Sequence, residues 1–187
     1  MDRYIDIHLL PDPEFTPPLL MSALFSKLHR ALVDHGRGDI GVSFPDVDSK
    51  HVRLGECLRL HGSGDALGLL MDLDWLQGMR DHTRLTPARP VPESASHRMV
   101  HRVQAKSSPA RLRRRLMKRQ GIDESAAADA IPDDAAERLQ LPYVTLSSHS
   151  TKQRFRLFIE HAPVQASPVA GSFSQYGLSS TATVPWF

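Results

Sequence analysis

Hydrophobic and polar residues alternate near the start of the chain, where Asp6 and His8 separate Ile5, Ile7 and Leu9. A period of two residues is typical of a strand that buries one face, so the pattern predicts a first strand here. Four prolines in the next nine residues indicate the loop that follows this strand.

The period then changes from two residues to that of a helix. Every fourth residue from Leu20 to Leu32 is a leucine. This spacing predicts an amphipathic helix over residues 19–35, and Gly36 gives it a natural end. Alternation returns over residues 40–44 and predicts a second strand.

The next elements complete a unit of known type. A third strand is expected around residues 56–61. Ser63 is placed to cap a second helix that carries Leu67 and Leu70. A short strand near Thr83 closes the unit. The order strand, helix, strand, strand, helix, strand predicts an α+β protein with an N-terminal ferredoxin-like domain. Many functions occur on this arrangement, so it does not select one of them.

The composition changes in residues 86–96, TPARPVPESAS, where proline and serine indicate a linker. We therefore divide the chain into a ferredoxin-like domain, residues 1–90, and a smaller C-terminal region, residues 97–187. The elements expected in the second region are a strand at residues 99–104, a basic helix, a helical segment at residues 126–139, and strands at residues 143–146 and 154–160.

The overall composition narrows the class of protein. Of the 187 residues, 41% are hydrophobic and 24% are charged, as in an ordinary globular protein. No apolar run is long enough to span a bilayer, and the N-terminal segment MDRYIDIHLLPDPE lacks the apolar core of a secretory signal. The single cysteine, Cys57, excludes an internal disulfide and a thiolate zinc cluster, so we expect a reducing, cytoplasmic setting.

Positive charge is concentrated in one part of the chain, although the formal net charge is only +2. Nine Lys/Arg residues and no acidic residue lie between Glu93 and Asp123, and six of the nine fall between Arg111 and Arg119. A local field of one sign indicates a polyanionic partner. The plain alternatives are a solvated helix face and a disordered basic linker.

The basic segment is expected to be a helix, because Ser108 and Pro109 form a typical helix start and Gly121 a typical end. At about 100° per residue, one side is basic and the neighbouring stripe carries Leu112 and Leu116, which can anchor the helix. The basic side consists of Arg111, Arg114, Arg115, Lys118 and Arg119. Like charges at this spacing repel one another, and a phosphate backbone relieves that repulsion, so nucleic acid is the favoured partner. The residues alone leave DNA and RNA open, because no helix-turn-helix, zinc-finger or basic-zipper pattern is present.

Several short stretches, taken together and in this order, are characteristic of one family. The chain resembles the CRISPR precursor-RNA processing endoribonucleases of subtype I-F systems over its whole length. The stretches that carry the resemblance are PDPEF, LFSKLH, GVSFPD, RVQAKSSPARLRRRLMKRQ, LPYVTLSSHSTKQRF, FRLFIEH, YGLS and VPWF.

The resemblance implies both an architecture and an activity. It implies a ferredoxin-like domain joined to a smaller region with an arginine-rich helix, in agreement with the patterns above. It also implies a metal-independent cut at the base of each repeat hairpin, by attack of a ribose 2′-hydroxyl on the adjacent phosphodiester. The products are a cyclic phosphate and a 5′-hydroxyl. The enzyme is expected to need no cofactor, to stay bound to the crRNA product, and to join other subunits of a subtype I-F surveillance complex.

The resemblance also assigns roles at the cutting site. His29 matches the general base and Ser148 the serine that holds the attacking ribose. Ser150 and Thr151 match residues that hydrogen-bond the phosphate region, and Tyr176 matches a tyrosine beside the catalytic histidine. Without the motifs, His29 reads as a partly buried packing residue and the serines as turn residues.

RNA recognition is assigned to residues outside the cutting site. Arg102 and Gln104 match residues that read a guanine and an adenine near the foot of the stem. Phe155 matches an aromatic that stacks under the last base pair, although its alternation with Leu157 and Ile159 also suits a core face. The groove and phosphate contacts carried over from the basic helix are Arg114, Arg115, Lys118 and Arg119. Because a lysine cannot form the bidentate fork, Lys118 is assigned to phosphate.

Two positions in the serine loop depart from the family pattern. Ser147 stands where the resemblance implies a basic residue, and His149 places a second imidazole near the expected scissile phosphate. Three alternatives to the endoribonuclease stay open: a hairpin-binding module without a competent site, metal-dependent hydrolysis through Asp81 and His82, and a DNA-binding regulator.

Overall fold

The structure is a computed structural model that describes residues 1–104, 109–132, 139–148 and 153–187. The chain forms two compact units, one made of Met1–Val103 and Leu141–Phe187 and the other of Gln104–Gln140. The α+β class is confirmed, because helices and antiparallel sheets both occur in the first unit. The domain division at residues 90 and 97 stays a prediction.

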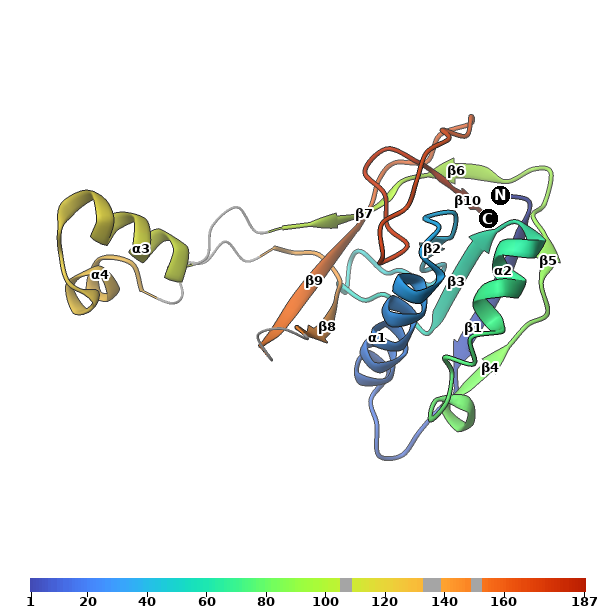
Figure 1. Cartoon of the computed structure of the whole chain (residues 1–187), viewed down its shortest axis with the longest axis horizontal. Helices are drawn as coiled ribbons and strands as arrows, with labels where there is room; N and C mark the ends of the chain where they lie inside the picture. Colours follow the sequence, from blue (N-terminus) through green and yellow to red (C-terminus); the bar gives the residue numbers. More distant parts are fainter. Residues whose placement is uncertain (105–108, 133–138, 149–152) are drawn as a thin grey trace. The chain divides into compact units, whose positions relative to one another are not determined.

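The first half of the chain forms an antiparallel sheet with two helices packed on it (Figure 1). The strand order is β2-β3-β1-β4, with Ile5 opposite Leu60 and Ile7 opposite Leu58. Its elements are β1 (Arg3–Leu9), α1 (Pro17–His35), β2 (Gly41–Ser43), β3 (Cys57–Gly62), α2 (Gly64–Met71), the 3-10 turn η1 (Arg80–His82) and β4 (Thr83–Leu85). This is the succession of elements that the hydrophobic pattern predicts.

The two helices have the ends that their sequences indicate. Pro17 opens α1, and Gly36 closes it in the left-handed conformation with φ 68° while its N–H donates to the carbonyl of Leu32 over 3.0 Å. Ser63 caps α2 by accepting a hydrogen bond from the N–H of Ala66 over 3.1 Å. The leucine stripe of α1 is buried against the sheet, as the period of 3.6 residues requires.

The stretch at residues 86–96 was expected to be a linker, and that expectation is wrong in part. Strand β5 (Arg89–Pro90) pairs with Tyr4 and Arg3 of β1, and β6 (Ser96–Arg98) pairs with β10 (Val184–Trp186). Proline is tolerated at a sheet edge, where its missing N–H is not required by a neighbouring strand. The local composition therefore indicated a loop while distant residues supplied strand partners.

The first unit also contains a second sheet, which lies on the other side of α1 (Figure 1). Its strands are β7 (Val100–Val103), β9 (Arg154–His161) and β8 (Tyr143–Ser147), in the order β7-β9-β8. Ser22 joins this sheet to α1, because its Oγ accepts from the N–H of Thr145 over 3.1 Å and donates to the carbonyl of Pro18 over 2.8 Å. This contact fixes the spacing between α1 and β8.

The second unit contains the basic helix α3 (Pro109–Gln120) and the short helix α4 (Glu124–Ala130), which pack against each other. Gly121 ends α3 with φ 68°, and Asp123 caps α4 by accepting from the N–H of Ala126 over 2.8 Å. The helical segment expected at residues 126–139 thus begins earlier, and residues 133–138 lie outside the described part of the chain, as does the expected cap Ser108. None of the described helices has the length and apolar character that crossing a membrane requires.

Candidate active site

A cavity of about 430 Å³ opens between α1, the ends of β8 and β9, and the turn that contains Tyr176. Its walls include four of the residues assigned from the sequence: His29, Ser148, Phe155 and Tyr176. The remaining lining residues are Ser26, Arg30, Leu146 and Ser147. Residues far apart in the chain therefore meet at one place.

The hydrogen bond of His29 decides which of its ring nitrogens carries the proton. Nδ1 lies 2.8 Å from the carbonyl oxygen of Gln175. A backbone carbonyl only accepts hydrogen bonds, so in the neutral ring Nδ1 holds the hydrogen and donates it. Nε2 is then left with its lone pair, which is the form that a general base requires.

The ring of Tyr176 stacks on the face of the His29 imidazole. The rings of His29 and Tyr176 have centroids 4.2 Å apart and are inclined by 15°. Phe25 lies beyond Tyr176 at 6.4 Å with nearly parallel rings, and Phe25 itself is completely buried. The stack thus connects the imidazole to the hydrophobic core, which limits its motion.

A tight turn supplies both contacts of His29, because Gln175 and Tyr176 are consecutive. The N–H of Gly177 closes the turn onto the carbonyl of Ser174 over 2.8 Å, with φ 69° at Gly177. A Cβ atom at Gly177 would lie 2.2 Å from Cγ2 of Val42, so the turn approaches β2 more closely than any side chain allows. Glycine in the YGLS stretch is therefore needed to place the two preceding residues.

Ser148 directly follows β8 at the other wall of the cavity. Its N–H donates to the carbonyl of Gln153 over 2.9 Å and closes the base of the β8–β9 hairpin. The residues assigned to phosphate, Ser150 and Thr151, and the neighbouring His149 lie outside the described part of the chain. The structure therefore places Ser148 at the cavity and leaves the other loop assignments as predictions.

Arg102 lies beside the same cavity, on β7. Its guanidinium carbon is 5.9 Å from the ring centroids of both Phe155 and Tyr176. Phe155 is half-buried at the end of a row whose other members, Leu157 and Ile159, are completely buried, so the core alternation holds and still leaves this ring on the cavity wall. Gln104 is exposed and follows directly after β7.

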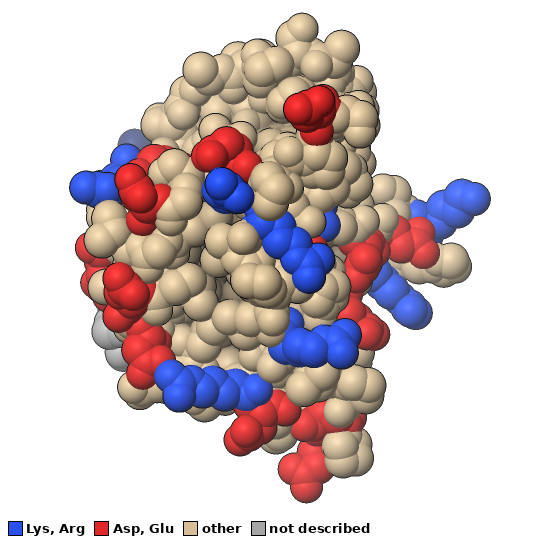
Figure 2. Space-filling model, turned by 90° about the vertical axis from the view of Figure 1, so that its right-hand side faces the viewer, with Lys and Arg blue, Asp and Glu red and all other residues tan. Residues whose placement is uncertain are grey.

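The cations of α3 fall into two groups. Arg111, Arg114, Arg115, Lys118 and Arg119 are exposed, as the helical spacing predicts. Arg113 is half-buried, and its Nε donates to the carbonyl of Ile131 over 2.7 Å, which ties α3 to the end of α4. The charge on the face shown in Figure 2 is mixed, because acidic and basic side chains are interspersed on it, whereas the exposed charges of α3 are all positive.

Comparison with known proteins decides the family. The family model described as "CRISPR-associated protein (Cas_Csy4)" matches residues 4–187. The chain belongs to this family. It is 54% identical over 187 residues to the CRISPR-associated endonuclease Cas6/Csy4 of Pseudomonas aeruginosa (strain UCBPP-PA14), and 49% identical over 187 residues to the protein of the same name from Escherichia coli (strain UTI89 / UPEC). Both matches cover the whole of each chain, which confirms the resemblance noted from the sequence.

Two lining residues of the cavity in this Cas_Csy4 protein, and a third residue beside it, were not singled out from the sequence. Ser26 precedes His29 by three positions and therefore shares its side of the helix, a signal that the helical period offers. Arg30 is the next residue along and also lines the cavity. Arg154 lies opposite Ser147 in the β8–β9 register, so only the strand pairing reveals their proximity.

One group of the described residues has the spacing of metal ligands. Donor atoms of Asp6, His8 and Cys57 lie within 4.8 Å of one another. Both carboxylate oxygens of Asp6, however, accept hydrogen bonds from Arg59, at 2.6 and 2.9 Å. Burial, together with the nearby carboxylate of Asp6, raises the pKa of the Cys57 thiol to about 12. A thiol that stays protonated and a carboxylate already bound to a guanidinium make a poor site for a cation. None of the three residues lines the cavity at His29.

The Asp81–His82 pair, considered for metal-dependent hydrolysis, also has a different partner. Nδ1 of His82 lies 2.9 Å from a carboxylate oxygen of Asp12. Two backbone N–H groups, those of Glu14 and Phe15, donate to the other oxygen of Asp12 and hold the pKa of this carboxyl below its usual value. His82 of η1 thus anchors the loop between β1 and α1 through Asp12.

Proposed function

We propose that this protein is an endoribonuclease that cuts CRISPR precursor RNA at the base of the repeat hairpin and remains bound to the crRNA product. The observation that carries the proposal is the orientation of His29. Its Nδ1 donates to Gln175, so Nε2 presents a lone pair in a cavity that Ser148 also lines. The family membership and the names of the two relatives support the same activity.

The proposed reaction is an internal transesterification that uses no metal ion. His29 Nε2 takes the proton from the 2′-hydroxyl, and the 2′-oxygen forms a bond to phosphorus while the bond to the 5′-oxygen breaks. The departing 5′-oxygen takes a proton from water and leaves as the 5′-hydroxyl. Ser148 orients the ribose, and Ser150 and Thr151 meet the charge of the phosphate. A base positioned in this way is worth about 10² to 10⁴ in rate. The products are a 2′,3′-cyclic phosphate and a 5′-hydroxyl.

The proposed binding surface has a part beside the cavity and a part on α3. Arg102 and Phe155 hold the foot of the stem, the first by hydrogen bonds to a guanine and the second by stacking. Gln104 reads an adenine nearby. Arg114, Arg115, Lys118 and Arg119 bind phosphates along the stem, which makes the affinity dependent on salt. The retained product then connects this protein to other subunits of a surveillance complex.

The decisive experiment incubates the purified protein with the repeat RNA of its own locus in EDTA and identifies the ends of the products. We expect cleavage with a cyclic phosphate and a 5′-hydroxyl, and no cleavage of an RNA with a single 2′-deoxy substitution before the cut. His29→Ala should bind the hairpin as tightly as wild type and fail to cut it, whereas the control His51→Ala, an exposed residue away from the cavity, should cut normally. Loss of cleavage in EDTA contradicts the mechanism, and a wild type that binds without cutting is a binding module instead.

A further inference from the structure

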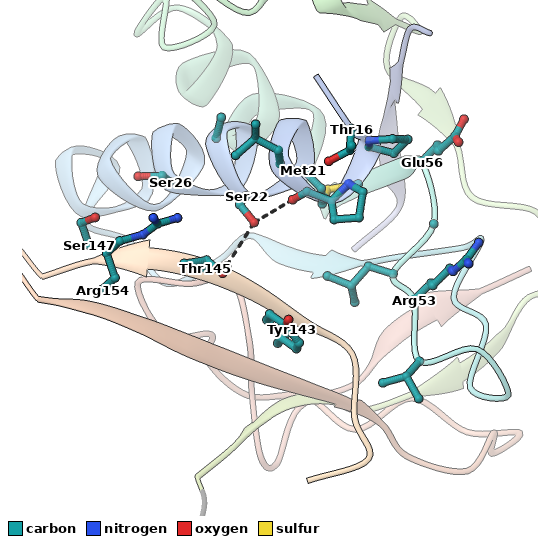
Figure 3. Close-up of a pocket in the computed structure, with 17 residues that line it drawn as sticks. Thr16, Met21, Ser22, Ser26, Arg53, Glu56, Tyr143, Thr145, Ser147 and Arg154 are labelled. Carbon is teal, nitrogen blue, oxygen red and sulfur yellow. Dashed lines mark hydrogen bonds between the residues drawn. The ribbon is translucent and has the colours of Figure 1, made fainter. Parts of the chain in front are cut away.

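A second, larger hollow adjoins the cavity at His29. This groove has a volume of about 890 Å³ and lies between the N-terminal half of α1, the loop before β3, and strands β8 and β9 (Figure 3). Its floor is formed in part by the contact between Ser22 and Thr145 that joins α1 to β8. The groove is therefore built on two elements whose spacing is fixed.

The groove and the cavity share part of their walls. Ser26 and Ser147 line both of them. Phe155 and Tyr176 line only the cavity, and Arg102 lies beside these two rings. The cavity at His29 is the proposed cutting site. The foot of the stem is proposed to bind at one end of it, and the other end adjoins the groove.

Two arginines give the groove a positive charge. Arg154 lies at the end nearest the cutting site, opposite Ser147 in the strand register, and Figure 3 shows it beside Ser147 and Ser26 while Arg53 lies at the far end. Both side chains are exposed, and within the part of the chain that the structure describes neither is paired with a carboxylate. Glu56 is the acidic residue of the wall.

Tyr143 lies along the groove wall between these ends (Figure 3). It is 39% exposed, and its ring is held by Phe158 at 5.4 Å and by the guanidinium of Arg156 at 4.6 Å. A fixed, exposed aromatic ring between separated cations is the combination with which proteins bind single-stranded nucleic acid, because every base has a face that can stack.

We propose that this groove binds the single-stranded RNA immediately downstream of the scissile phosphate. The inference rests on the proposed function, which places the stem at the Arg102 end of the cutting site. The strand that crosses the site then passes Ser26 and Ser147 and enters the groove. Arg154 binds the first downstream phosphates, Tyr143 stacks on a base, and Arg53 binds the phosphate backbone farther along. Arg154 also supplies the positive charge that position 147 lacks.

The test compares three RNAs that carry a 2′-deoxy substitution before the cut, so that binding is measured without cleavage. One RNA has a single nucleotide after the scissile phosphate, the second has about six unpaired nucleotides there, and the third has the same extension at the 5′ end of the hairpin instead. For wild type we expect the downstream extension to tighten binding about fivefold to tenfold at moderate salt, as two phosphate contacts would. The 5′ extension should add no more than about twofold, since it gains only non-specific charge interactions.

The variant Arg53→Ala/Arg154→Ala should lose most of the gain from the downstream extension and bind the short RNA as wild type does. Tyr143→Ala should lose part of the gain, and Tyr143→Phe should keep it, because the phenyl ring still stacks. Arg37→Ala, an exposed arginine that lines neither hollow, is the matched control and should behave as wild type.

Equal affinity of wild type for the short and the downstream-extended RNA overturns the proposal. A gain from the 5′ extension that the groove variants abolish also overturns it. An unchanged gain in the double variant overturns it as well. A parallel assay with all-ribose RNA separates this proposal from the proposed function. If that RNA is cut and the extension adds nothing, only the groove assignment fails; if it is not cut, the endonuclease proposal fails.

Discussion

The rings of His29 and Tyr176 are stacked, with centroids 4.2 Å apart, and the residue before Tyr176 accepts the Nδ1 hydrogen of the same imidazole. Two consecutive residues of one turn therefore fix both the position and the tautomer of His29. All the groups in this arrangement belong to the protein, so the fold itself orients the imidazole. Preorganisation of this kind avoids the cost of ordering the group at the moment of reaction.

Removing the ring of Tyr176 should slow cutting without weakening RNA binding. In Tyr176→Ala the imidazole keeps its hydrogen bond to Gln175 and loses its lateral support, so we expect the single-turnover rate to fall about tenfold to 100-fold, as small misplacements of a reacting group do. Tyr176→Phe retains the stack and should cut at nearly the wild-type rate. The measurement is the cleavage rate at saturating protein, with hairpin affinity determined on 2′-deoxy RNA. A large loss of rate in Tyr176→Phe would assign the role to the hydroxyl and not to the ring.

Arg115→Ala should weaken hairpin binding while the cutting step stays nearly unchanged. Arg115 is exposed on α3, far along the chain from His29, and is assigned to groove and phosphate contacts. Loss of one such contact should lower the affinity and reduce the slope of log K against log salt by about one. The control is Arg37→Ala, which removes an equal charge elsewhere. A drop in the rate of saturated protein with unchanged affinity would contradict this division of labour.

The helices of the first unit and the basic helix were predictable from sequence because their signals are local. The leucine period of α1, the cap at Ser63 and the terminal Gly121 all act within a few residues of themselves, and the structure has them where the pattern indicates. The strands at residues 86–96 were not predictable, because β5 and β6 owe their pairing to β1 and β10, which are distant in the chain.

The site shows the same division between local and distant information. Sequence motifs identified His29, Ser148 and Tyr176 as site residues. The hydrogen-bond acceptor of His29, however, is a backbone carbonyl, which every residue type carries and which the sequence therefore does not reveal. The proximity of Arg154 to Ser147 is not predictable from the sequence, because it depends on the strand register. The requirement for glycine at position 177 likewise comes from the close approach of Val42, a residue of β2 that is distant in the chain.

Breaking the buried ion pair between Asp6 and Arg59 should destabilise the first unit strongly. Both residues are buried, and Arg59 also lies over the rings of Tyr4 and Phe187, at 4.6 and 4.1 Å. Asp6→Ala leaves this guanidinium buried without its carboxylate, which typically costs about 3 to 5 kcal/mol. Urea unfolding should show the loss, with Asp2→Ala, at an exposed carboxylate, as the control. A change below about 1 kcal/mol would mean that water reaches Arg59.

Two histidines with buried ring nitrogens should make the protein less stable in mild acid. Burial, with Arg59 nearby, lowers the pKa of His61 to about 3, and burial, with Arg98 and His101 nearby, lowers the pKa of His161 to about 3. His61 bonds to Ser43 through Nε2, and within the described residues neither ring nitrogen of His161 has a partner. Both rings are therefore neutral in the folded protein.

The direction of the pH effect follows from the difference between the two states. In the unfolded chain a histidine has a pKa of about 6.5, so between pH 6.5 and pH 3 the unfolded state binds protons that the folded state does not. The contribution of each histidine is fully present above pH 6.5 and is lost as the pH falls, by about 1.4 kcal/mol per pH unit. Urea unfolding between pH 7 and pH 5 should show this decline, and His161→Phe, which keeps an aromatic ring between Phe44 and Trp186, should have about half the slope. Val33→Ala provides the control, since the exposed side chain of Val33 has no titratable group and its removal should leave the slope unchanged. A wild-type free energy of unfolding that stays constant over this range would show that the two rings are protonated while folded.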